Sequence, residues 1–141
     1  MITPLNAPRD FGSPFHSQGV LVTGVDGFVV VSGQVGVRPD GTVGRGVGEQ
    51  TTIAMENVRA VLAEADLDLT AVITFTIHLT DDAHIADFVE HASTFLHPDP
   101  SRRPAATLLI QDRLANPDLL VQIEAMAAVQ RGDVDRGIGG R

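Results

Sequence analysis

The segment from Leu119 to Val129 constrains the fold most, because it alternates with the period of a β-strand yet is apolar on both sides. One side carries Val121 and every second residue onward to Val129. The other side carries Leu120, Met126 and Ala128, together with Gln122 and Glu124. Such a strand needs cover on both faces of its sheet. We expect helices over one face and a second copy of the chain over the other, since so short a chain has nothing left to cover it.

Four further strands are predicted by alternating or β-branched runs of residues. They lie at residues 20–23, 28–32, 71–79 and 105–111. Asp26 and Gly27 stand between the first two runs, and an Asp-Gly pair in that position predicts a hairpin turn.

Two helices are predicted by apolar residues at helical spacing, at about residues 48–65 and from Asp82 to Leu96. Side chains at 80–82 can cap the second helix, and turns are expected at 39–41 and 116–118. The order of elements predicts an α+β protomer in which both helices cover one face of a mixed sheet, because crossover connections are right-handed.

The composition excludes several kinds of chemistry. The chain has 141 residues, its ten basic residues are all Arg, and it has no Cys. Schiff-base lysines, P-loop lysines, thiol nucleophiles and cysteine-bound metals are therefore impossible. The net charge of −8 disfavours a nucleic-acid partner, since such binding depends on clustered cations.

One domain over residues 1–131 accounts for the periodic part of the chain, followed by a flexible tail at 132–141. The Pro-rich residues 1–14 also lack periodicity, so we expect them to be disordered. Neither a signal peptide nor a membrane span is recognisable, so we expect a cytoplasmic protein without a membrane partner.

Glu124 is the most informative candidate for chemistry, because strands disfavour a carboxylate in mid-strand. A solvated surface position and a partly desolvated acid–base group both remain open at this stage. The motif Arg102-Arg103-Pro104 is either solvated charge or an anion clamp. Metal binding is not expected, because His84 and His91 lie two helical turns apart, roughly 10.5 Å.

Several short motifs occur together in an order that resembles the YjgF family, also called the Rid (reactive intermediate deaminase) family. They are residues 28–34 (FVVVSGQ), 49–51 (EQT), 55–58 (MENV), 79–81 (LTD), 103–107 (RPAAT) and 121–125 (VQIEA). The resemblance covers about residues 14–130. It implies a chorismate-mutase-like α+β protomer, assembled as a homotrimer whose sheets form a central barrel with ligand clefts between subunits.

The same resemblance implies a function. Its best-known members hydrolyse enamines and imines to 2-oxo acids and ammonia without a metal or cofactor. In them an Arg clamps the substrate carboxylate and a Glu on the last strand positions water. The Glu position is matched here by Glu124, the Ser-Gly pair of the cleft by Ser32 and Gly33, and an aromatic residue of the cleft by Phe15.

The clamping Arg is where this sequence departs from the family. Ala106 stands in its place, followed by Thr107, and the chain resembles a subgroup that lacks this Arg. We therefore expect a small-molecule protein that hydrolyses a specific imine, enamine or related metabolite, but not a standard 2-iminobutanoate deaminase. Arg102, Arg103 or Arg113 could supply the missing cation. A non-catalytic metabolite-binding trimer and a structural or chaperone-like trimer are the alternatives.

Overall fold

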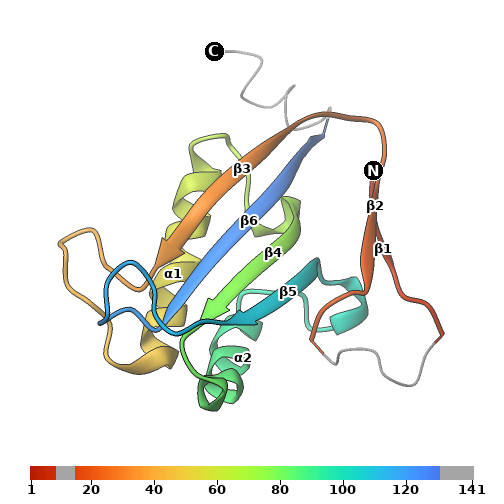
Figure 1. The fold of residues 1–141 in the computed structure, drawn as a ribbon. Coiled ribbons are helices and arrows are strands. Elements are labelled where there is room, and N and C mark those ends of the chain that lie inside the picture. Colours follow the sequence, from red (N-terminus) through yellow and green to blue (C-terminus); the bar gives the residue numbers. More distant parts are fainter. Residues whose placement is uncertain (9–14, 131–141) are drawn as a thin grey trace.

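The computed structural model describes residues 1–8 and 15–130, and the fold is drawn in Figure 1. Six strands occur in the order β1 (Ile2–Leu5), β2 (Gly19–Val22), β3 (Val25–Val35), β4 (Val72–Leu79), β5 (Ala105–Ile110) and β6 (Val121–Gln130). The helices are α1 (Gly46–Ala63) and α2 (Ile85–Ser93), with short 3₁₀ turns η1 (Leu69–Ala71), η2 (Asp82–His84) and η3 (Pro100–Arg102). The predicted mixture of helices and strands is confirmed.

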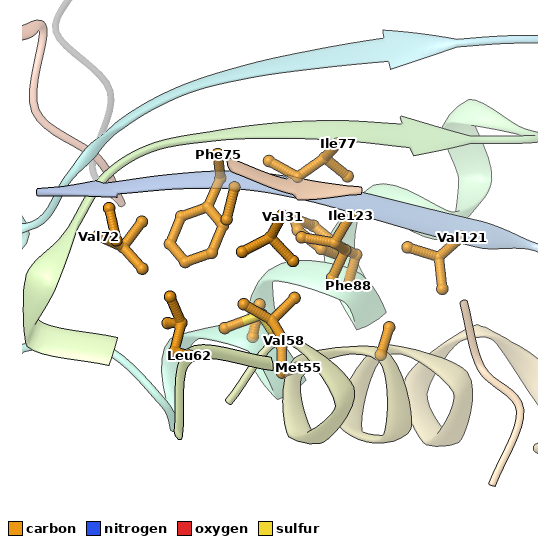
Figure 2. Close-up of a cluster of buried hydrophobic side chains, with 14 of the residues drawn as sticks. Val31, Met55, Val58, Leu62, Val72, Phe75, Ile77, Phe88, Val121 and Ile123 are labelled. Carbon is orange, nitrogen blue, oxygen red and sulfur yellow. The ribbon is translucent and has the colours of Figure 1, made fainter. Parts of the chain in front are cut away.

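The main sheet has four strands in the order β3-β6-β4-β5. β6 runs antiparallel to both of its neighbours, and β4 and β5 are parallel. β6 therefore lies inside the sheet, with a neighbouring strand on each side. Both helices pack on the same face of the sheet (Figures 1 and 2), which confirms the predicted two-layer arrangement.

The core lies between this face and the helices. Met55, Val58 and Leu62 of α1 are fully enclosed and point toward the sheet (Figure 2). Phe75 of β4 and Ile123 of β6 meet them from the other side, and the remaining labelled side chains of Figure 2 continue this layer.

A buried amide ties α1 to the sheet. Gln50 donates to the carbonyls of Gly44 and Asp118 at 3.1 and 3.0 Å, and it accepts a hydrogen bond from the backbone N–H of Leu120 at 2.8 Å. The loop after β3 approaches this residue so closely that a Cβ on Gly36 would lie 2.6 Å from the Cα of Gln50. Glycine is therefore required at that position, and the loop that leads into β6 is fixed against the helix.

The predicted hairpin between residues 20–23 and 28–32 is wrong. The chain turns earlier, at Gly24, whose φ is +60°, and Asp26 and Gly27 lie within β3. β2 pairs with β1, whereas β3 pairs with β6 over its length. Pairing along all eleven residues of β3 stabilises the fold more than a four-residue hairpin would, because the long ladder also buries Val31 in the core.

Two boundaries also differ from the expectation. The N-terminal residues 2–5 form β1, although their Pro content predicted no structure, and this strand lies at the edge of a two-stranded sheet where Pro is tolerated. The second helix ends at Ser93, three residues before the predicted end. The predicted tail at 132–141 lies outside the described residues.

The face of the sheet opposite the helices is here called the open face. It carries Phe28, Val30, Thr74, Thr76, His78, Thr107, Leu109, Gln122, Glu124 and Met126, as register and alternation require. Phe28, Val30 and Leu109 are exposed on it, Val30 to 72%. The single chain thus leaves a partly apolar sheet face uncovered.

Candidate functional site

Glu124 projects from β6 onto the open face, opposite Thr76 of β4. Its side chain is 46% exposed and borders a cavity of about 130 Å³. The cavity lies over β3, β6 and β4, and Val30, Thr74 and Met126 form much of its lining. The carboxylate therefore stands among apolar and hydroxyl groups in a hollow that a small molecule can reach.

His78 is the partner of this carboxylate. Its Nε2 lies 2.6 Å from Oε2 of Glu124, and its side chain is only 15% exposed. Its Nδ1 is buried and has no hydrogen-bond partner among the described residues. Sequence reasoning missed this residue: its place on the polar side of an alternating strand was visible, but the register that sets it beside Glu124 was not.

Ser32 and Gly33 lie directly across from Glu124, at a β-bulge of β3. The ladder pairs Val31 with Ala125 and then Gln34 with Ile123, so two residues oppose one. A Cβ on Gly33 would lie 2.2 Å from Nε2 of Gln122, so the Gln122 side chain occupies the space that Gly33 leaves. The structure thus brings the predicted Ser-Gly pair and Glu124 together.

Ala106 lies on the opposite side of the sheet, facing the helices. It pairs in register with Phe75, and with Phe15 and Phe88 it borders a small cavity of about 30 Å³ beneath α2. Within one protomer the sheet therefore separates Phe15 and Ala106 from Glu124. Thr107, the next residue, is exposed on the open face and forms one row with Thr76 and Glu124.

Arg103 is buried, with 7% exposure, and its guanidinium binds protein groups. Nε donates to the carbonyl of His97 at 2.6 Å, and Nη1 donates to the carbonyl of Phe15 and to Oγ of Ser93 at 3.3 and 3.2 Å. The bond to Phe15 ties Arg103 to the residues that lead into β2. These residues run alongside the start of β5 (Figure 1), where the backbone N–H of Ser17 donates to the carbonyl of Pro104.

The other two arginines that could replace the family's clamp also lie away from Glu124. Arg102 is exposed at the end of η3, and Arg113 donates to the carbonyls of Leu114 and Ala115 in its own loop, each at 3.1 Å. Among the described residues, no guanidinium borders the Glu124 cavity of a single protomer.

Local hydrogen bonds lower the pKa of four exposed carboxyl groups elsewhere in the fold. The pKa of Asp81 falls chiefly because its side chain accepts from the N–H of Ala83 at the start of η2. The predicted cap thus lies on this 3₁₀ turn, whereas α2 begins at Ile85 without a side-chain cap hydrogen bond. Hydrogen bonds from Thr42, Arg38 and Ser101 likewise lower the pKa values of Asp40, Glu49 and Asp99, respectively. In residues 1–8 and 15–130, no group of three or more His, Asp or Glu side chains is arranged to hold a metal ion.

Comparison with known proteins places these features in context. The sequence pattern of the family described as Endoribonuclease L-PSP matches residues 13–129. A RutC family protein of Pyrococcus abyssi is 31% identical over 123 residues, covering 86% of this chain and 90% of that protein. TdcF of Escherichia coli, named as a reactive intermediate deaminase, is 31% identical over 112 residues, covering 77% of this chain and 86% of its own length.

Solved structures share the fold. A Rid-family protein of Yersinia pestis matches with a TM-score of 0.78 at 23% identity, covering 91% of this chain and 98% of that one. A YjgF-family protein of Mycobacterium tuberculosis matches with a TM-score of 0.64 at 26% identity, covering 92% and 100%. No helix within the described ranges has the length and hydropathy required to cross a bilayer.

Proposed function

The chain belongs to the Endoribonuclease L-PSP family, which includes the YjgF, Rid and RutC proteins, and from this membership we propose that it hydrolyses a small imine, with Glu124 positioning the attacking water. The observation that carries the proposal is the place of Glu124. Its carboxylate is half exposed at the rim of a cavity, beside the Ser32–Gly33 bulge, and one of its oxygens is held by His78.

The proposed reaction needs only groups that this arrangement supplies. Glu124 accepts a hydrogen bond from water, and the water oxygen attacks the imine carbon while its proton passes to the carboxylate. The proton then moves to the nitrogen, and the carbon–nitrogen bond breaks to give a carbonyl compound and ammonium. For an aldimine the balance is RCH=NH₂⁺ + H₂O → RCHO + NH₄⁺.

The cavity favours a substrate without a carboxylate. Of the residues that the structure describes, Glu124 is the one charged residue in the lining of this cavity, and the other lining residues are apolar or carry a hydroxyl group. Ala106, which stands in the place of the family's Arg, cannot bind a substrate carboxylate as a guanidinium does. A carboxylate placed there would meet a like charge, whereas a protonated imine would meet an opposite one. Arg103 has a different proposed role: its hydrogen bond to Phe15 supports the aromatic side of the ligand cleft.

We further propose that three copies close the site as a homotrimer. The exposed Phe28, Val30 and Leu109 support this assembly, since covering them removes apolar surface from water. The cleft between copies would join Glu124 and Thr107 of one copy to the Phe15 and Ala106 side of the next. This would reunite the groups that the sheet separates within a protomer.

The test compares two imines with the same branched carbon skeleton. A flavin monoamine oxidase generates the imine of 2-methylpropylamine, and a flavin amino acid oxidase generates the imine of valine, which adds the carboxylate. Imine decay is followed by semicarbazide trapping. We expect the protein to accelerate decay of the carboxylate-free imine, Glu124→Gln to lose that acceleration, and the exposed Glu64→Gln to retain it.

Background decay of both imines in the presence of the wild-type protein would refute the hydrolytic proposal and favour a non-catalytic binding trimer. Faster decay of the valine imine alone would instead show that a cation from a neighbouring copy completes the site. A monomer in size-exclusion chromatography with light scattering would refute the closed assembly.

A further inference from the structure

We propose that His78 is a positioning residue: it donates a hydrogen bond from Nε2 to Oε2 of Glu124 and thereby leaves Oε1 for water. The pairing itself rests on geometry alone, and its consequence for catalysis rests on the proposed function. The two residues come from neighbouring strands, with His78 opposite Gln122 and Glu124 opposite Thr76 in the β4–β6 ladder. They are diagonal neighbours on one face, a distance that long side chains span.

The surroundings of the imidazole select one tautomer. A neutral imidazole has one N–H donor and one acceptor nitrogen. With the proton on Nε2, the 2.6 Å contact is an N–H donor facing a carboxylate oxygen. With the proton on Nδ1, two acceptors would face each other, and a buried N–H would lack a partner.

The burial of Nδ1 therefore leaves Nε2 as the nitrogen that donates. Nδ1 is enclosed without an acceptor among the described residues, and a buried unsatisfied donor is costly. Nε2 instead faces a carboxylate oxygen of Glu124.

This arrangement orients the carboxylate. The last torsion of a Glu side chain is broad, so a half-exposed carboxylate turns freely unless one oxygen is held. A charge-assisted bond at one oxygen aims the other at the cavity. Removing the donor is expected to lower kcat about 10- to 100-fold, because water would no longer be aligned. KM is expected to stay nearly constant, because the cavity lining is unchanged.

The activity test uses three variants on the carboxylate-free imine. His78→Leu removes the donor, His78→Gln places an amide N–H near the same position, and His84→Leu is a matched histidine control outside the cavity. We expect a loss of kcat in His78→Leu, substantial recovery in His78→Gln and no change in His84→Leu. Equal kcat values in His78→Leu and His84→Leu would overturn the positioning role.

A spectroscopic test separates this inference from the proposed function. Long-range ¹H–¹⁵N spectra of the ¹⁵N-histidine-labelled protein report the tautomer, and the His78→Gln spectrum assigns the signal. We expect the Nε2–H tautomer in the wild type and a changed signal in Glu124→Gln. An Nδ1–H tautomer, or a His78 signal that is the same in Glu124→Gln and in the wild type, would overturn the pairing. The tautomer measurement tests the pairing even if the wild-type protein hydrolyses no imine. If His78→Leu does not fold, His78→Gln still assigns the His78 signal.

Discussion

Replacing Arg103 by Ala tests whether this buried guanidinium holds the fold or binds a ligand. The short bond to His97 contributes about 1.5–3 kcal/mol, and the longer bonds to Phe15 and Ser93 contribute about 0.5–1.5 kcal/mol each. The substitution also removes the packing of the apolar stem. We expect Arg103→Ala to lower the free energy of unfolding by about 3–5 kcal/mol. Arg103→Lys should lose about half as much, because a single ammonium cannot match the spread of a guanidinium.

The assay is urea unfolding at one fixed protomer concentration, since assembly stabilises the folded state by mass action. With an m value of about 2 kcal/mol/M, the expected loss moves the midpoint by about 2 M. Arg102→Ala is the matched control, because the neighbouring side chain is exposed, and it should change stability by less than about 0.5 kcal/mol.

Equal midpoints for Arg103→Ala and Arg102→Ala would refute the structural role. A variant of unchanged stability that had lost ligand binding would show instead that the guanidinium clamps an anion. The two roles of Arg103 therefore make opposite predictions for the same pair of measurements.

Three further predictions concern the fold. Leu62→Ala leaves a cavity in the enclosed core and should cost about 2–5 kcal/mol in chemical denaturation. A Cβ on Gly48 would lie 2.5 Å from the His91 ring, so Gly48→Ala should destabilise the wild type. In a His91→Ala background the same change should stabilise by up to about 1 kcal/mol, which a double-mutant cycle measures. Asp81→Ala should destabilise at neutral pH. Because the folded pKa of Asp81 lies below the unfolded one, that contribution is present above the unfolded pKa, and denaturation at stepped pH should show it fading as pH falls through the folded pKa.

The layers of the fold could be predicted from the sequence because they depend on local periodicity. The helical spacing of apolar residues predicts α1, and strict alternation predicts β4. The two apolar sides of β6 predict a strand whose sheet is covered on both faces. Strand pairing is not a local property. The Asp26–Gly27 signal competed with a ladder to β6, about 100 residues away in sequence, and the longer ladder prevailed.

The candidate site was predictable only in part, for the same reason. Glu124 was notable because its residue type is unusual in a strand, and Ser32 and Gly33, which the resemblance assigns to the same cleft, lie across from it. The pairing of His78 with Glu124, which are 46 residues apart in sequence, depends on the register of two strands. The separation of Ala106 from Glu124 depends on which way each strand faces, and no single motif encodes that.

The two faces of the sheet have different roles, so substitutions on them are expected to have different consequences. Side chains toward the helices carry the folding energy, and Glu124, His78 and Thr76 on the far side contribute little to that packing. Replacements among the latter would therefore alter the proposed site while leaving the packing between helices and sheet unchanged. Substitutions at the proposed site therefore need no prior gain in the stability of the fold.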